Sequence, residues 1–205
     1  FVVGDVSDKG VPAALFMARA VSVLEIAARR HTRPDGILIA ASTRLAENNE
    51  TCMFATVLCG LINVVSGDYW LASAGHEPPL LIDLDGQARP LLLETGAPLG
   101  IEVQDHYPVL QGRMTAGQTL LGYTDGVTEA MDEHGASYGL PRLLAAMHPR
   151  RSAAAQCKAL IADIARFTGQ ADQYDDITLL AIRLRQEHAG TVDTAGREDP
   201  GEAGT

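Results

Sequence analysis

Two kinds of spacing between apolar residues succeed one another along the chain. An apolar run over residues 1–3 predicts a strand that ends in a glycine-containing turn. Apolar residues then recur at helical spacing over residues 12–30 and again over residues 37–45. Either Thr32 or Asp35 is placed to cap the second of these segments. The N-terminal part of the chain is therefore predicted to form a strand followed by two consecutive helices.

The middle of the chain changes to the pattern of strands. Residues 54–65 are rich in Val, Ile, Leu and Thr, and a Ser-Gly-Asp turn at residues 66–68 leads into a second strand. Two further apolar runs flank Asp85-Gly86, a pair typical of a two-residue hairpin connection. Apolar runs over residues 118–123 and 177–184 complete the predicted strands.

Helical spacing returns over residues 140–147 and 152–167. This order does not alternate as βαβ units, so it favours antiparallel sheet with helices packed outside, an α+β layered domain. We expect that domain to span residues 1–185 and to be truncated at its N-terminus, because the chain begins inside a predicted strand. Residues 186–205 are polar and without periodicity, and are expected to form a disordered tail.

Composition narrows the classes of function. A chain of 205 residues suits one substantial domain. Its formal net charge of −10 argues against a general nucleic-acid binder, which needs a basic face. The three cysteines are widely spaced and match neither a zinc nor a disulfide pattern, in keeping with a cytoplasmic location. We find no run of about 18 apolar residues, so no membrane segment is expected in this chain.

Three aspartates share one setting, since Asp5, Asp125 and Asp175 each follow an apolar strand and adjoin a glycine or another aspartate. Strand ends hold side chains rigidly, and converging carboxylates would repel one another unless a cation neutralised them. Hard oxygen ligands of this kind suit Mg²⁺ or Mn²⁺ rather than zinc. Each aspartate taken singly can equally be a turn former or a helix cap, and spacing alone leaves both readings open.

Five motifs occur in a fixed order and carry a family resemblance. They are GDVSDKGVPAAL at 4–15, AGHEPP at 74–79, GAPLGI at 96–101, YTDGVTEA at 123–130 and DDIT at 175–178. Through these motifs and their order, the chain resembles the bacterial SpoIIE/RsbU-type serine/threonine phosphatases of the PP2C-like (PPM) superfamily. The resemblance implies an αββα sandwich of two antiparallel sheets flanked by helices, here without its N-terminal strand or strands.

The resemblance also implies a site for two Mn²⁺ or Mg²⁺ ions. Asp5 would bridge the ions with the Val6 carbonyl as a further ligand, and Asp125 with an acid of the Asp175-Asp176 pair, Asp175 preferred, would complete the shell of one ion. Water activated by the ions would attack the phosphorus of phosphoserine or phosphothreonine. The family has another acidic ligand upstream of its first motif, so the second ion is expected to depend on residues that precede this chain.

Three further residues are candidates for auxiliary roles. Ser7 stands where eukaryotic relatives have a proton-donating histidine, which leaves the general acid unassigned, and water can serve instead. Asp8 replaces a glycine of the family pattern and is either a turn or cap residue or an acid near the ions. His76 lies at a predicted strand-to-loop corner, where it makes either a structural hydrogen bond or an acid–base contribution.

The leading interpretation is a protein phosphatase that acts on a regulatory protein. By resemblance the substrate is a phosphorylated anti-sigma-factor antagonist of the STAS type, with a sensor such as a PAS, GAF or receiver domain upstream in the full-length protein and a possible homodimer. The alternative is a catalytically weak or inactive phosphatase-fold scaffold, which the absent upstream ligand and Asp8 favour. Hydrolysis of a small phosphate ester is a third possibility, although the sequence lacks a nucleotide-cradling loop.

Overall fold

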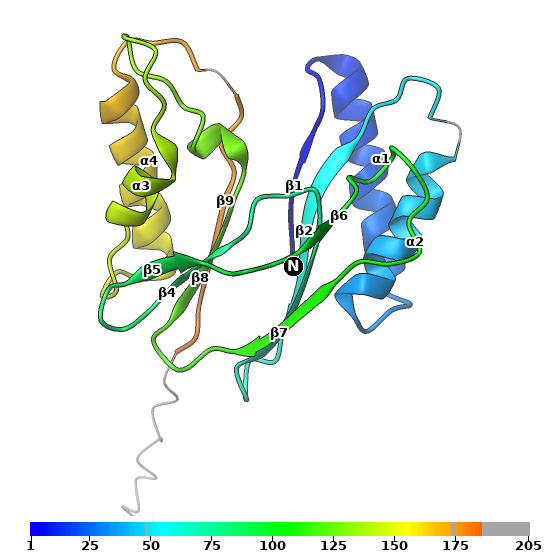
Figure 1. Cartoon of the computed structure of the whole chain (residues 1–205), viewed down its shortest axis with the longest axis horizontal. Coiled ribbons are helices and arrows are strands. Elements are labelled where there is room, and N and C mark those ends of the chain that lie inside the picture. The colour runs from blue at the N-terminus through cyan, green and yellow to red at the C-terminus, as the bar shows by residue number, and fades with distance from the viewer. Residues whose placement is uncertain (48, 174, 186–205) are drawn as a thin grey trace, which may run out of the picture.

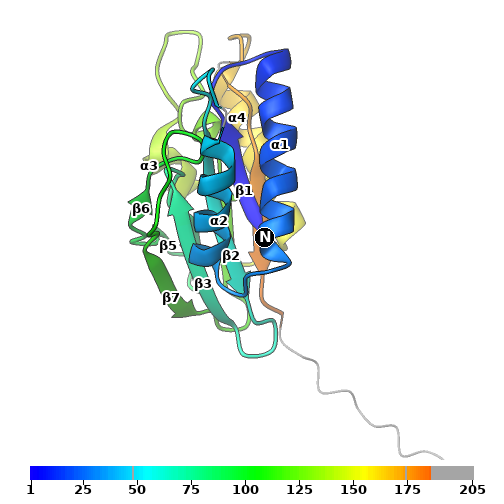
Figure 2. The same ribbon diagram turned by 90° about the vertical axis from the view of Figure 1, so that its right-hand side faces the viewer.

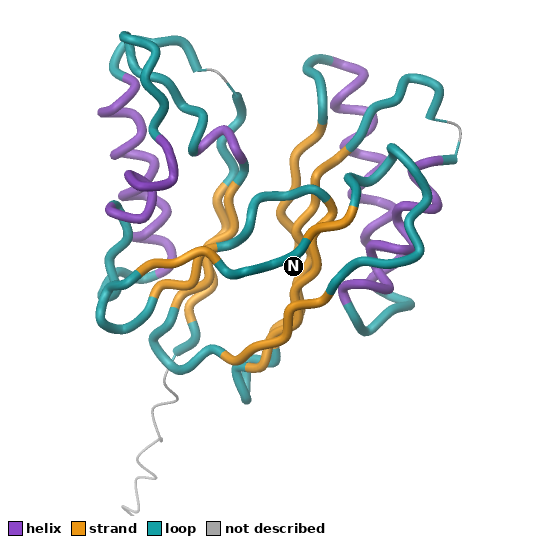
Figure 3. The backbone as a smooth tube through the Cα atoms, viewed as in Figure 1, coloured by secondary structure: helices purple, strands orange, loops and turns teal. Residues whose placement is uncertain are grey.

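The computed structural model describes residues 1–47, 49–173 and 175–185, and it forms four layers. Two sheets lie in the middle and a pair of helices covers the outer face of each (Figures 1 and 3). The predicted α+β architecture with two sheets flanked by helices is confirmed. The predicted tail over residues 186–205 lies outside the described residues.

The first sheet is built on three consecutive antiparallel strands. These are β1 (Val2–Val6), β2 (Ala55–Ile62) and β3 (Asp68–Ala74). The free edge of β3 pairs antiparallel with β7 (Val109–Arg113) and in parallel with the short β6 (Thr95–Gly96). The strand β1 therefore lies at one edge of this sheet.

The second sheet has the strand order β5-β4-β8-β9, with every neighbouring pair antiparallel. Its strands are β4 (Leu80–Ile82), β5 (Ala88–Pro90), β8 (Thr119–Tyr123) and β9 (Leu179–Arg183). All five residues of β8 are buried, which is the burial expected for a central strand covered on both faces.

Helices α1 (Val11–Ala28) and α2 (Pro34–Ala46) cover the first sheet, and α3 (Gly139–Ala145) and α4 (Ala153–Thr168) cover the second (Figures 1 and 2). Each helix pair packs on its own sheet through a separate apolar cluster. A third cluster lies between the sheets and consists of Tyr69, Leu71, Leu81, Leu91, Met114 and Leu120. Burial of apolar side chains therefore holds all three interfaces between layers together.

Helix α1 is long and apolar enough, by length and composition, to cross a membrane, with mean hydropathy 1.7 over its 18 residues. The sequence analysis expected no such segment because it found no run of about 18 apolar residues. One helix of this kind is weak evidence, since core helices of soluble proteins pass the same test. In this fold Phe16, Ala20 and Leu24 of α1 are buried against the first sheet.

The start of α2 differs from the expectation. Its first residue is Pro34, and the preceding Arg33 has extended φ and ψ of −133° and 144°. A proline presets the helical φ, lacks an N–H that needs a partner and forces the residue before it out of the helical region. The prediction that Thr32 or Asp35 caps this helix is therefore wrong, and Asp35 lies in the first turn beside the Arg33 guanidinium at 3.2 Å.

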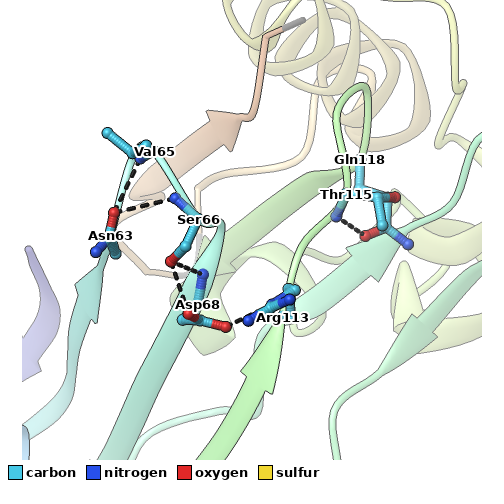
Figure 4. Close-up of polar contacts among 7 residues, drawn as sticks. All are labelled: Asn63, Val65, Ser66, Asp68, Arg113, Thr115 and Gln118. Carbon is cyan, nitrogen blue, oxygen red and sulfur yellow. Dashed lines mark hydrogen bonds and ion pairs between the residues drawn. The ribbon is translucent and has the colours of Figure 1, made fainter.

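The predicted Ser-Gly-Asp turn lies between β2 and β3 (Figure 4). The Asn63 side-chain oxygen accepts hydrogen bonds from the backbone N–H groups of Val65 and Ser66 at 2.9 and 3.1 Å. The Ser66 hydroxyl donates to Asp68, whose other oxygen accepts from Arg113 at 2.6 Å. The same aspartate therefore closes the turn and ties β7 to β3.

One local prediction in the strand region is wrong, and two strands were not predicted. Strand β4 ends at Ile82 and β5 begins at Ala88, so residues 83–87 connect them and the hairpin is not of the two-residue kind. The backbone N–H of Asp83 donates to the carbonyl of Gln87 at 2.8 Å, which closes a longer loop. The sequence analysis also missed β6 and β7, because neither is a continuous apolar run.

Candidate metal centre

Asp5, Asp125 and Asp175 converge at one end of the two sheets. One carboxylate oxygen from each lies within 4.8 Å of the other two, and all three side chains are half-buried. Asp5 comes from the first sheet, whereas Asp125 follows β8 and Asp175 precedes β9 in the second. Packing of the two sheets therefore brings together acids that are far apart in the sequence.

Strand pairing positions Asp5. The strand β1 continues through Val6, so Asp5 lies within the strand and faces Thr56 of β2 in the register. Gly4 permits this pairing, since a Cβ there would lie 2.7 Å from the Thr56 carbonyl oxygen. Beyond the strand, the Ser7 hydroxyl accepts a hydrogen bond from the Phe54 backbone N–H at 3.0 Å. Ser7 therefore secures the end of β1 against the residue that precedes β2.

Two loops of the second sheet are clamped to each other beside Asp125. The Thr124 hydroxyl donates to the Asp176 carbonyl at 3.1 Å and accepts from the Thr178 backbone N–H at 2.9 Å. Asp125 itself begins a 3-10 turn, Asp125–Val127. A Cβ at Gly126 would lie 2.3 Å from the Asp176 carbonyl oxygen, so only glycine allows the two loops to approach this closely.

The two acids of the Asp175-Asp176 pair have different roles in this geometry. The Asp175 carboxylate belongs to the convergent group, accepts a hydrogen bond from the Asp176 N–H and lies 3.4 Å from the Lys9 ammonium. Asp176 contributes its carbonyl to the clamp on Thr124, and its negative charge acts on Asp5. The sequence analysis listed both acids as candidate ligands and preferred Asp175, and the structure brings Asp175 into the group of three.

The electrostatics of the site fit a bound cation. Burial raises the pKa of Asp5 above its ordinary value, a hydrogen bond from the Val6 N–H opposes that rise, and the charges of Asp125, Asp175 and Asp176 add to it. Among the described residues, the buried Oδ1 of Asp125 has no hydrogen-bond partner. The carboxylates repel one another, and one buried oxygen lacks a partner, so a cation would stabilise the group. Carboxylate oxygens are hard ligands of the kind that Mg²⁺ and Mn²⁺ prefer.

Asp8 lies at the mouth of the site without capping α1. Its φ of 67° is in the left-handed region, which explains why a glycine suits this position. The residue that caps α1 is Gly10, and no described side chain makes a cap hydrogen bond there. Asp8, Lys9 and Asp175 line one pocket of about 320 Å³ together with Asp5 and the first turn of α1.

His76 is buried two residues beyond the end of β3. Only 6% of its surface is exposed, and its Nδ1 lies 2.9 Å from the Thr56 hydroxyl. Burial lowers the pKa of the His76 imidazole. A hydrogen bond with the Tyr123 backbone and the charge of Asp125 oppose this shift to a smaller extent. His76 therefore makes the structural hydrogen bond that the sequence analysis considered. Its partner is Thr56, which lies opposite Asp5 in the β1–β2 register.

Sequence reasoning missed two acids beside Asp125. Burial raises the pKa of Glu77, and the charges of Asp125 and Glu129 raise it further. The signal was available, because Glu129 follows Asp125 by four residues, one turn of a helix, and Glu77 adjoins His76 in its motif. The negative field of the site therefore extends beyond the three convergent aspartates.

Comparisons with known proteins agree on one family. The sequence profile described as Stage II sporulation protein E (SpoIIE) matches residues 1–185. Protein IcfG of Synechocystis is 30% identical over 88% of this chain, and phosphoserine phosphatase RsbU of Bacillus subtilis is 28% identical over 65% of it. This chain corresponds to 33% of the length of IcfG and 40% of that of RsbU.

Solved structures agree on the fold. The SiaA-PP2C domain of Pseudomonas aeruginosa matches with a TM-score of 0.75 and 25% identity, covering 89% of this chain and 73% of that one. The catalytic domain of the serine/threonine phosphatase PstP, a structure in complex with two manganese ions, matches with a TM-score of 0.67, covering 90% of this chain and 87% of that one. At 13% identity the likeness to PstP shows the fold alone.

Proposed function

This chain belongs to the SpoIIE family of PP2C-type phosphatase domains, and from that premise we propose that it is a metal-dependent protein serine/threonine phosphatase with residues 1–185 as its catalytic domain. The observation that carries the proposal is the convergence of Asp5, Asp125 and Asp175 within 4.8 Å. A phosphatase of this kind needs an anionic pocket that holds cations beside an open surface. Asp5 and Asp175 line the open pocket next to α1, and the Asp125 carboxylate lies within 4.8 Å of both.

The proposed ligands are oxygen atoms from both sheets. The Asp5, Asp125 and Asp175 carboxylates and the Val6 carbonyl would hold Mn²⁺ or Mg²⁺, with two ions as the proposed number and Asp176 beside them. When bound, the ions would make water more acidic and offset the charge of the phosphoryl oxygens. The manganese in the structure of PstP supports this assignment.

The surrounding residues suit a phosphate group on a protein. Lys9 carries a positive charge at the pocket mouth, and the N-terminus of α1 adds the partial positive charge of the helix dipole. In the reaction a bond forms from a water oxygen to phosphorus, the bond to the serine or threonine oxygen breaks, and that oxygen takes a proton. No described side chain is assigned as the proton donor, so water is proposed to supply it.

The substrate is proposed to be a phosphorylated regulatory protein, an anti-sigma-factor antagonist of the STAS type. The similarity to RsbU, which is named a phosphoserine phosphatase, supports phosphoserine as the group that is hydrolysed. This chain spans a third of the length of IcfG, which is consistent with a sensor domain elsewhere in a longer protein. A homodimer and a cytoplasmic location belong to the same proposal.

The test is metal-dependent hydrolysis of p-nitrophenyl phosphate by the chain and its Asp125→Asn variant. We expect turnover with Mn²⁺ that EDTA abolishes and that Asp125→Asn reduces at least about 100-fold, because a ligand and a charge are lost together. Asp105→Asn is the matched control, since it removes the same charge from an exposed loop. Mn²⁺ binding without turnover would contradict the proposal and favour the inactive scaffold.

A further inference from the structure

Another pocket lies beside the proposed metal centre and differs from it in chemistry. It has a volume of about 290 Å³ and lies between helix α4, the residues that follow β8 and the segment that precedes β9. Asp175 lines both this pocket and the acidic pocket next to α1, so the two pockets are neighbours. We call it the apolar pocket, because most of its lining is aliphatic: Ala130, Met131, Ile161, Ile164, Ala165 and Ile177.

Two large side chains of the apolar pocket are exposed to solvent. Ile161 is 54% exposed and Met131 is 36% exposed. On α4, Ile161, Ala165 and Thr168 are four and three residues apart, so they lie on one face of the helix. Ile164 is buried in the cluster between the second sheet and its helices, which anchors this face. Contiguous exposed apolar side chains of this kind mark sites that bind a partner or a ligand.

Hydrogen bonds hold the sides of the apolar pocket in place. The Ala130 carbonyl accepts from the Tyr138 backbone N–H at 2.8 Å, which closes the loop between them. The Tyr138 hydroxyl donates to Asp163 of α4 at 2.6 Å. The Glu133 carboxylate accepts from the Gln170 backbone N–H at 2.9 Å, just beyond α4. The loop and the helix are therefore fixed to each other, and a pocket formed in advance binds without the cost of ordering its own residues.

The size and charge of the apolar pocket limit what fills it. Its volume is at the lower end of the range for ligand pockets, so it suits a single apolar side chain rather than a whole helix. Asp172 and Asp175 in its lining carry negative charge, which repels nucleic acid and anionic lipid. A protein segment whose phosphoserine lies at the three aspartates would place a neighbouring side chain near this pocket, because residues of an extended chain are about 3.3 Å apart.

We propose that the apolar pocket is a specificity site, which binds one apolar side chain located within about three residues of the phosphoserine in the substrate protein. The inference rests on the proposed function, since it requires the phosphoserine to lie at the three aspartates. The phosphate is the same in every phosphoserine, so contacts outside it must distinguish one substrate protein from another. Burial of an aliphatic side chain should favour the matching substrate about 10- to 100-fold.

The first experiment measures binding without turnover. Fluorescein-labelled peptides carry at their centre a phosphonate analogue of phosphoserine, which cannot be hydrolysed, in a background of glycine and serine. A series places leucine at each of the three positions on either side. In fluorescence anisotropy with Mn²⁺, leucine at one or two positions should lower Kd about 10- to 100-fold relative to the background peptide. Equal Kd values across the series, or no measurable binding, would overturn the inference.

The second experiment assigns the preference to the apolar pocket. Ile161→Gln makes its lining more polar, and Ile26→Gln is the matched control because Ile26 is 55% exposed on α1. The preference is the ratio of Kd for the background peptide to Kd for the leucine peptide. It should fall at least about 5-fold in Ile161→Gln and remain unchanged in Ile26→Gln. An unchanged ratio in Ile161→Gln would count against the proposal; if that variant does not fold, Met131→Gln is judged by the same ratio.

Turnover and oligomeric state separate the proposal from its alternatives. With hydrolysable phosphoserine peptides, kcat/KM should show the same preference for leucine, and no preference would overturn the inference. Failure to hydrolyse p-nitrophenyl phosphate would refute the proposed function alone, because the Kd series is measured without turnover. A second copy of the chain in the pocket would appear in analytical ultracentrifugation as a dimer that Ile161→Gln disrupts, and would also overturn the inference.

Discussion

Replacing Asp5 by asparagine should stabilise the metal-free protein. Three carboxylate oxygens lie within 4.8 Å of one another, and two unit charges at that distance repel by about 3.5 kcal/mol at an effective dielectric constant of 20 and by about 0.9 kcal/mol in water. The site is half-buried and open to solvent, so the lower part of this range applies. Asparagine keeps an oxygen for the Val6 N–H, and relief of repulsion should add about 1–2 kcal/mol.

The assay is thermal unfolding with EDTA and with Mn²⁺. In EDTA, Asp5→Asn should raise Tm by about 2–8 °C, the shift expected for this free energy in a chain of this size. At free Mn²⁺ of about 100 times Kd, the unmodified chain should gain about 2.7 kcal/mol while the variant gains little, so the order of stability reverses. The control Asp105→Asn should leave both measurements within about 0.5 kcal/mol of the unmodified chain. A lower Tm for Asp5→Asn in EDTA would refute the argument that these acids repel.

The same repulsion determines a pH dependence. The pKa of Asp5 is raised above its ordinary value of 3.8, chiefly by burial and further by the neighbouring acids, so the native state binds this proton more tightly than the unfolded state. The contribution of Asp5 to metal-free stability is therefore complete below the unfolded pKa and is lost as the pH rises through the native pKa. Urea unfolding in EDTA should show this loss in the unmodified chain and not in Asp5→Asn.

Three further substitutions test the loops and the core. Gly126→Ala places a Cβ 2.3 Å from the Asp176 carbonyl oxygen, so it should lower the free energy of unfolding in urea by about 1–3 kcal/mol. Mn²⁺ binding measured by calorimetry should weaken as well. Unchanged binding would show that the contact between the two loops does not position Asp125. Asp8→Gly should gain about 1 kcal/mol in the same unfolding assay, because it relieves a φ of 67°, and a loss would mean that the Asp8 side chain stabilises its turn. Leu38→Ala in the fully buried face of α2 should cost about 2–5 kcal/mol, and a cost below that range would indicate that the cluster collapses around the vacancy.

The sequence predicted the features that depend on neighbouring residues in the chain. Periodicity gave both helix pairs and the long strands, and the motifs around Asp5, Asp125 and Asp175 singled out the acids that the structure brings together. The parts that it missed depend on contacts between distant segments. Strand β7 alternates only weakly and is defined by its pairing with β3, and the contact of His76 with Thr56 exists only because β2 and β3 are neighbours.

The three acids come from two different sheets, and this division has a mechanical consequence. Each sheet keeps its own hydrogen-bond ladder, while apolar packing between the sheets and the proposed site join one sheet to the other. A cation bound by Asp5 of the first sheet and by Asp125 and Asp175 of the second would connect the two sheets and oppose their sliding past each other. Sliding one sheet past the other by about 1 Å would misplace the ligands without breaking a strand pair. Metal binding at the proposed site would therefore depend on how the two sheets, each with its own helix pair, are aligned.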